Sequence, residues 1–260
     1  MSEDLMLAVA ELASLVGKTA LGYYGRGVDV EVKGDGSPVT AADRAAETVA
    51  REWIASHFPL DGILGEEFGV TRPDARRRWI VDPIDGTRTF IRTVPLWGTL
   101  VAVAEGPEIL AGAACFPAVN EIVVAAVGQG CWHNGSRCFV SNVADLSSAA
   151  VMVTDDRFRE DERRTRAWRD LASRCAVARS WGDCYGYLLV ATGRAEAMID
   201  DIVSPWDAAA LMPIITEAGG SFTDWKGEAT AFGGDVIATN GPLSVPVREI
   251  LIGRRNGSHA

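Results

Sequence analysis

Several features that mark common functional classes are missing from this sequence. Its 260 residues include three histidines and no H-E-x-x-H motif, so a zinc enzyme of that type is poorly supported. The five cysteines are an odd set without a C-x-x-C pair, which indicates neither a disulfide framework nor a zinc knuckle. Unpaired cysteines suit a reducing compartment, and we therefore expect a cytoplasmic protein.

Long apolar runs and basic clusters are absent as well. No apolar run approaches the roughly 20 residues that a bilayer-spanning helix needs, and the first residues, MSEDLMLAVAELASL, lack a basic leader and a cleavage-like site. The formal net charge is -10, with 35 acidic and 25 basic residues, and the run Arg76–Arg78 is too short to follow a phosphate backbone. We expect no membrane and no nucleic-acid partner.

The pattern of apolar residues predicts a helix-and-sheet arrangement for the first half. With 48% hydrophobic residues, the chain can build one compact unit or two sub-domains that share a cleft. We expect a helix ending near Gly22, a second helix from the capping box at Thr40 to about His57, and a largely antiparallel sheet. The strands expected in that sheet lie in the runs GILGEE, RWIVD, TLVAVA and EIVVAAV.

The second half alternates strands and helices, which is typical of α/β folds. Its expected elements are a charged helix over 160–174, a helix from about Tyr185, the strand AEAMID, a helix from Asp207 to Ala218, and the closing strands GSFTD and DVIATN. We predict an N-terminal α+β sub-domain over residues 1–143 and a C-terminal α/β sub-domain over residues 144–260.

The stretch WIVDPIDGT places two aspartates, Asp82 and Asp85, directly after an apolar run. We expect the strand to end at Asp82, and Pro83 and Ile84 to form a turn. Taken alone, the two aspartates are explained as a turn cap and a helix cap. Two anions this close repel by roughly several kcal/mol in a partly buried site unless a cation lies between them.

Other carboxylates follow separate elements. Glu66 and Glu67 end an apolar run, and Asp207 stands at the start of an expected helix. Taken alone, the two glutamates are explained as solvent-exposed turn residues and the aspartate as a helix N-cap. Together they form a set of oxygen ligands that suits magnesium. The N–H groups of Gly86 and Thr87, at an expected helix start, can hold a phosphate. Because the sequence has no G-x-x-x-x-G-K-[ST] motif, hydrolysis of a phosphate ester is the plainer interpretation.

These motifs resemble the inositol-monophosphatase-like phosphatases, a magnesium-dependent and lithium-sensitive family. The matching segments occur in family order over nearly the whole chain: K-x-D-x-S-P-V-T-x-A-D at Lys33–Asp43, GEE at Gly65–Glu67, WIVDPIDGT at Trp79–Thr87, PWDAAAL at Pro205–Leu211 and EAGG at Glu217–Gly220. The resemblance implies a layered αβαβα sandwich of the inositol-monophosphatase and fructose-1,6-bisphosphatase type. It also implies a homodimer and a small phosphorylated metabolite as substrate, with metal held by the N-terminal sub-domain and substrate by the C-terminal one.

The resemblance further implies a role for each matching residue, and two to three magnesium ions per site. The implied ligands are Glu66, Asp82 and the Ile84 carbonyl for the first ion, Asp82, Asp85 and Asp207 for the second, and Glu66 and Glu67, with Asp43 through water, for the third. Thr87 and Glu66 are expected to orient the attacking water, and Asp85 completes the catalytic set.

The segment ARSWGDCYGY resembles the histidinol-phosphate phosphatases of this superfamily. Asp183 follows Gly182 where inositol phosphatases carry small residues, and a carboxylate suits a cationic leaving group. We expect Arg179 to hold Asp183 in place; the alternative for Asp183 is a helix N-cap. The remaining implied substrate contacts are Gly86, Thr87, Asp200 and Asp207, with Asp200 standing where inositol-specific members tend to have glutamate.

The leading functional hypothesis is hydrolysis of L-histidinol phosphate to L-histidinol and phosphate in histidine biosynthesis. An inositol monophosphatase, or a broad sugar-phosphate or nucleotide phosphatase of the same superfamily, is the alternative among enzymes. A non-catalytic regulatory protein on the same fold is the alternative from another class. The full set of carboxylates speaks against the last, because a scaffold has no need to hold them together against their repulsion.

Overall fold

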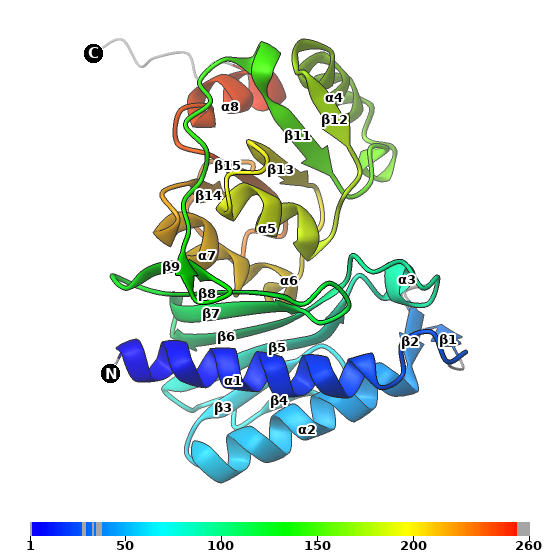
Figure 1. The fold of residues 1–260 in the computed structure, drawn as a ribbon, viewed down its shortest axis with the longest axis vertical. Coiled ribbons are helices and arrows are strands. Elements are labelled where there is room, and N and C mark those ends of the chain that lie inside the picture. Colours follow the sequence, from blue (N-terminus) through cyan, green and yellow to red (C-terminus); the bar gives the residue numbers. More distant parts are fainter. Residues whose placement is uncertain (1, 28–29, 33, 35–37, 254–260) are drawn as a thin grey trace.

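The computed structural model describes residues 2–27, 30–32, 34 and 38–253, and it has five layers (Figure 1). Two long helices, α1 (Ser2–Leu21) and α2 (Ala41–His57), cover one face of the first sheet. A middle layer of short helices separates this sheet from a second one, and two further helices close the far side. The predicted αβαβα sandwich is confirmed. Lys33, Asp35 and Ser37 of the early motif lie outside the described residues.

The first sheet has eight strands in the order β10-β9-β8-β7-β6-β5-β3-β4. Its strands are β3 (Gly62–Gly65), β4 (Gly69–Thr71), β5 (Arg77–Asp85), β6 (Gly98–Glu105), β7 (Glu108–Phe116), β8 (Glu121–Ala126), β9 (Gly130–His133) and β10 (Ser136–Arg137). Every neighbouring pair is antiparallel except β3 and β5, which confirms the largely antiparallel arrangement. A separate ribbon joins β1 (Val30–Val32) to β2 (Pro38–Thr40).

The second sheet has five strands in the order β12-β11-β13-β15-β14. Its strands are β11 (Ala150–Val153), β12 (Val177–Arg179), β13 (Ala197–Asp200), β14 (Ser221–Thr223) and β15 (Val236–Thr239). The helices of this half are α4 (Glu162–Arg174), α5 (Cys184–Ala191), α6 (Pro205–Ala208), α7 (Leu211–Glu217) and α8 (Ser244–Ile252), with 3-10 turns η1 (Leu146–Ser148) and η2 (Phe158–Glu160). The predicted division at residue 143 falls in the segment between the two sheets and stays a prediction.

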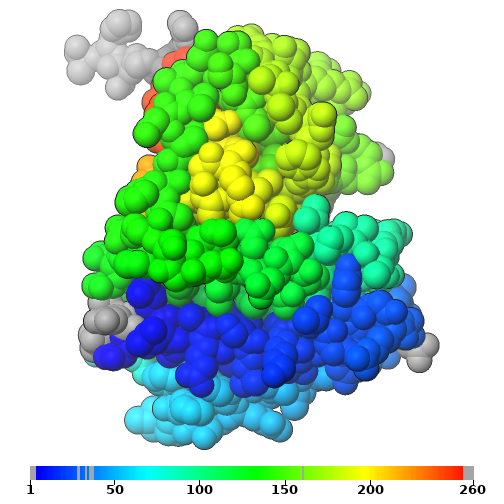
Figure 2. Space-filling view, viewed as in Figure 1, coloured from blue at the N-terminus to red at the C-terminus, as the bar shows by residue number. Residues whose placement is uncertain are grey.

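Three hydrophobic clusters hold the layers together. One packs α1 and α2 on the first sheet, through residues such as Leu12 and Val101. Another packs α4 and α8 on the outer face of the second sheet. The largest lies between the sheets and joins Leu100 of β6, Leu188 of α5 and Met198 of β13. The two halves therefore share a core, and Figure 2 shows them in contact along one face.

The single helix predicted from Asp207 to Ala218 is wrong, because the structure has two, α6 and α7. Pro213 explains the break: its ring would clash with the carbonyl of Ala209 in a continuous helix.

The break packs closely on β7, where a Cβ at Gly112 would lie 2.3 Å from the Ala210 carbonyl oxygen. Small residues of this kind weaken a strand pattern, and β7 was not among the predicted strands.

None of the described helices is both long enough and apolar enough to cross a lipid bilayer.

Candidate metal and phosphate site

A β-bulge in β5 positions the two aspartates of WIVDPIDGT. The pairing of β5 with β6 moves from Asp82↔Leu100 to Asp85↔Gly98, so three steps along β5 match two along β6. In a regular strand, residues three apart point to opposite faces of the sheet. The extra residue of the bulge lets the side chains of Asp82 and Asp85 point to the same face. The predicted turn at Pro83 and Ile84 is therefore wrong: both residues belong to the strand.

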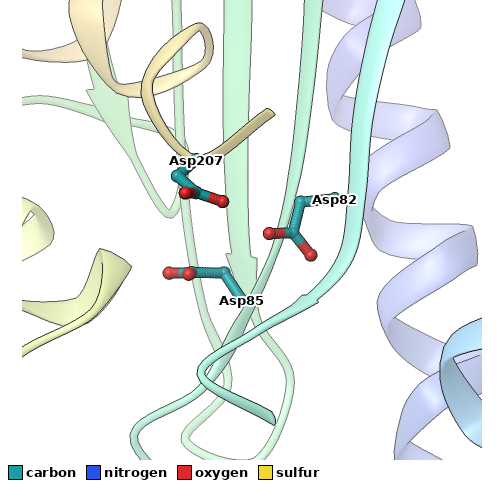
Figure 3. Close-up of side chains that lie close together, drawn as sticks. All are labelled: Asp82, Asp85 and Asp207. Carbon is teal, nitrogen blue, oxygen red and sulfur yellow. The ribbon is translucent and has the colours of Figure 1, made fainter. Parts of the chain in front are cut away.

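The carboxylates of Asp82, Asp85 and Asp207 face a common space between β5 and α6 (Figure 3). One oxygen of each lies within 4.8 Å of the others, and Asp82 is buried. Removal from water, then the charges of its neighbours, raises the pKa of Asp82 well above its usual value. The same burial raises the pKa of Asp207 to about 7. These mutually repelling oxygens fit a divalent cation, which would offset their charge.

Local hydrogen bonds hold the three side chains in place. Asp82 accepts the backbone N–H of Ile84 at 3.0 Å, and Asp207 accepts that of Ser204 at 2.6 Å. Asp85 accepts the backbone N–H of Cys184 at 2.5 Å, so it joins the first sheet to the start of α5. The site is thus built from both halves of the chain.

Glu66 and Asp43 lie beside this cluster. The backbone N–H of Glu66 donates to the Val81 carbonyl at 3.3 Å. Burial raises the pKa of Asp43, as it does for Asp82 and Asp207, and the charge of the Glu66 carboxylate raises all three further. Asp43 completes the predicted capping box, since one oxygen accepts from the Thr40 N–H at 2.7 Å. Its other oxygen, Oδ1, is buried without a hydrogen-bond partner. That oxygen is available to an ion or to a water bound to one.

Helix α3 (Thr87–Phe90) begins directly after the cluster, as predicted. Gly86 precedes it with φ of 86°, a left-handed conformation that glycine adopts without strain. The Thr87 hydroxyl donates to the Ile84 carbonyl at 3.1 Å, so its lone pairs remain able to accept a hydrogen bond from a water.

A cavity of about 180 Å³ extends from the cluster into the second half of the chain. Its lining residues are Asp85, Thr154, Asp155, Asp183, Cys184, Tyr187, Asp200, Asp201, Ile202, Val203, Asp207 and Leu211. The predicted Asp183 and Asp200 are among them. Asp155, Asp201 and Tyr187 were missed, because none of them belongs to a motif. Asp200 accepts from the Tyr187 hydroxyl at 2.8 Å, and burial raises its pKa to about 6.

Asp183 does not cap α5 through its side chain, which removes the alternative explanation of this residue. Its φ is 51°, an unfavourable backbone conformation that contacts must maintain. Its N–H donates to the Thr154 hydroxyl at 2.9 Å, and its carboxylate accepts from the Thr89 hydroxyl at 3.1 Å. The carboxylate rests against Gly86, where a Cβ would lie 3.0 Å from Oδ2.

Arg179 does not hold Asp183, contrary to prediction. It ends the edge strand β12, is exposed, and donates to the Ala178 carbonyl at 2.7 Å. Thr89 holds the Asp183 carboxylate instead. Burial raises the pKa of Asp183, and the Thr89 hydrogen bond and the charge of Arg88 offset part of this increase.

Comparisons with known proteins identify the family of this chain. A sequence model of the inositol monophosphatase family matches residues 2–258. A histidinol-phosphatase from Chlorobaculum parvum is 41% identical over 99% of this chain and 98% of its own length. A fructose-1,6-bisphosphatase/inositol-1-monophosphatase from Thermotoga maritima is 35% identical over 93% of each chain.

Solved structures show the same fold. The extragenic suppressor protein suhB from Bartonella henselae superposes with a TM-score of 0.90, at 27% identity over 95% of this chain and 98% of its own. An inositol monophosphatase from Zymomonas mobilis has a TM-score of 0.85, at 30% identity over 96% and 98%. The chain belongs to the inositol monophosphatase family and is a phosphoric monoester hydrolase.

Proposed function

We propose that this protein is a magnesium-dependent histidinol-phosphatase that releases phosphate from L-histidinol phosphate, a step of histidine biosynthesis. The observation that carries the proposal is the charge of the cavity. Beyond the metal cluster, four more carboxylates line it, namely those of Asp155, Asp183, Asp200 and Asp201. Histidinol carries an ammonium and a titratable imidazole, whereas inositol carries no positive charge, so this lining favours histidinol.

The donor set fits magnesium, which prefers carboxylate and carbonyl oxygens. Asp82, Asp85, Asp207 and Glu66, with the Ile84 carbonyl, would hold two ions. A third would lie near Glu66 and Glu67, with Asp43 reaching it through water. The unpartnered Asp43 Oδ1 supports that assignment. When bound, magnesium supplies charge for the phosphate oxygens and lowers the pKa of an attached water.

The protein groups around the phosphate have separate tasks in this proposal. Thr87 and Glu66 accept hydrogen bonds from the attacking water and orient it, and the Glu66 carboxylate would take the proton that the water loses on attack. The N–H groups of Gly86 and Thr87, at the start of α3, bind phosphate oxygens. Asp183 and Asp200 face the departing alcohol, and at pH values above about 6 Asp200 is ionised and attracts its positive charge.

A panel of phosphate esters tests the proposal. Phosphate release from histidinol phosphate, inositol 1-phosphate, fructose 1,6-bisphosphate and a nucleotide 3′-phosphate is measured with magnesium and again with excess chelator. We expect histidinol phosphate to be the best substrate and chelator to stop its hydrolysis. Turnover that survives chelation would contradict the metal assignment. An inositol monophosphatase remains the second candidate, because the Thermotoga maritima relative carries that name.

Magnesium affinity is expected to fall as the pH drops below about 7. Burial raises the pKa of Asp207 to about 7 in the metal-free protein, so at lower pH this carboxyl holds a proton that the ion must displace. Each proton that the ion displaces makes the affinity fall by about tenfold per pH unit below the pKa of that group, and the raised pKa values of Asp82 and Asp85 add to the fall that Asp207 causes. Calorimetric titration with magnesium chloride at pH 6, 7 and 8 measures this slope. A flat profile would contradict the participation of Asp207.

The proposal also includes a cytoplasmic location, which the unpaired cysteines favour, and two properties implied by the family resemblance, a homodimer and inhibition by lithium. Light scattering of the purified protein tests the dimer. Phosphate release at increasing lithium concentration, beside a lithium-sensitive family member, tests the inhibition by lithium.

A further inference from the structure

Glu47 is a buried carboxylate next to the metal site that has no role in the proposed reaction. It lies on α2 one turn after Asp43, with no exposed surface. Its two oxygens accept consecutive backbone N–H groups, from Glu67 at 2.7 Å and from Phe68 at 3.2 Å. Glu47 therefore ties the loop that follows β3, the loop that carries Glu66, to α2.

Arg51 balances the buried charge and extends the connection. Its Nε donates to Glu47 at 2.7 Å, and its other nitrogens donate to the Thr71 hydroxyl at 2.8 Å and to the Gly69 carbonyl at 2.5 Å. A buried carboxylate without such a partner would be strongly destabilising. The ion pair thus bridges α2 to β4 and holds both ends of the loop.

The first residue of the GEE motif shows how closely Glu47 approaches the loop. A Cβ at Gly65 would lie 2.1 Å from Glu47 Oε1, so only glycine leaves room for the carboxylate. Gly65 has an ordinary strand conformation, so this close approach, and not backbone freedom, explains the glycine. Glu66 follows Gly65 directly in the chain and lies between it and Glu67, whose N–H Glu47 accepts.

We infer that Glu47 is a positioning residue, which directs Glu66 toward the metal cluster by holding the backbone of the loop. The inference rests on the proposed metal site. A carboxylate suits this role because all three of its partners are donors, the amides of Glu67 and Phe68 and the Nε of Arg51. A glutamine would place its NH₂ group against at least one of them.

A double-mutant cycle with Glu66 tests the inference. Magnesium affinity is measured by calorimetry for wild type, Glu47→Gln, Glu66→Gln and the double variant. We expect Glu47→Gln to weaken binding about ten- to a hundredfold, the range for groups that orient metal ligands. In the Glu66→Gln background the same change should weaken binding by less than about threefold, because Glu47 acts through Glu66.

Glu217→Gln is a matched control. Glu217 also accepts two backbone N–H groups, those of Gly128 at 2.8 Å and Gly130 at 2.7 Å, but at the turn between β8 and β9. Its substitution should leave magnesium affinity unchanged. Wild-type affinity in Glu47→Gln, or independent losses that add in the double variant, would overturn the positioning role. A wild-type protein that binds no magnesium would instead overturn the proposed metal site.

A second variant covers the case in which Glu47→Gln does not fold. Glu47→Asp keeps the negative charge opposite Arg51, but its side chain is one methylene shorter and cannot reach both amides. We expect weaker magnesium binding in this variant too, in the same direction and of smaller size. Glu47→Asp with wild-type affinity would overturn the inference.

Discussion

Asp82→Asn should abolish magnesium-supported hydrolysis and leave the fold intact. The activity loss is expected to be at least about a thousandfold, because Asp82 is the carboxylate assigned to both ions. Asparagine keeps the oxygen that accepts the Ile84 N–H and resembles the protonated carboxyl that burial favours in the metal-free protein. Thermal unfolding in chelator should therefore show an unchanged or higher midpoint.

Asp224→Asn is the control for this variant. Asp224 is another buried aspartate, in the turn after β14, where it accepts the N–H of Glu228 at 2.8 Å. Its substitution should retain activity, whatever it does to the unfolding midpoint. Substantial activity in Asp82→Asn, or equal losses in both variants, would contradict the assignment of Asp82 to a metal.

Asp183→Asn should reduce the preference for histidinol phosphate over inositol 1-phosphate by about ten- to a hundredfold. A charge-assisted contact in a partly desolvated pocket contributes about 1.5 to 3 kcal/mol, and a neutral alcohol gains nothing from it. Asparagine tolerates a positive φ and can still accept from Thr89, so the variant removes the charge with little change of backbone. The ratio of the two kcat/KM values measures the effect.

Asp161→Ala is the matched control for a helix cap. Asp161 caps α4 by accepting the N–H groups of Arg163 and Arg164, at 2.8 and 3.1 Å. Its loss should lower stability by about 1 kcal/mol and leave the substrate ratio unchanged. Asp183→Asn with an unchanged ratio, or with equal losses on both substrates, would limit Asp183 to a structural role.

The sequence predicted those parts of the site whose residues lie within one short segment of the chain. Asp82 and Asp85 stand three residues apart in one motif, and the repulsion between them is evident without a structure. The capping box at Thr40 was also predictable, because its signature lies within a short segment, and the layered fold was implied by the family resemblance of motifs spread over the chain. The structure brings Asp207 to the same cluster, as expected from its motif.

Features that depend on distant contacts were not predictable. A proline within D-P-I-D favours a turn, and only the pairing with β6 shows the bulge that keeps it in the strand. Arg179 is near Asp183 in sequence, but its side chain is exposed at the end of β12 and donates to the Ala178 carbonyl. The contact that Asp183 does make, with Thr89, joins residues 94 apart in the chain.

A competition between two substrates in one tube tests the central claim most directly. Equal concentrations of histidinol phosphate and inositol 1-phosphate are mixed with the enzyme and magnesium at pH 7.5, a value chosen above the pKa of Asp200, about 6, and of Asp207, about 7. Phosphorus NMR follows both esters, and their relative rates of loss give the ratio of kcat/KM directly. The acidic cavity predicts that histidinol phosphate disappears first, with a ratio above about ten. Equal rates, or earlier loss of inositol 1-phosphate, would contradict it.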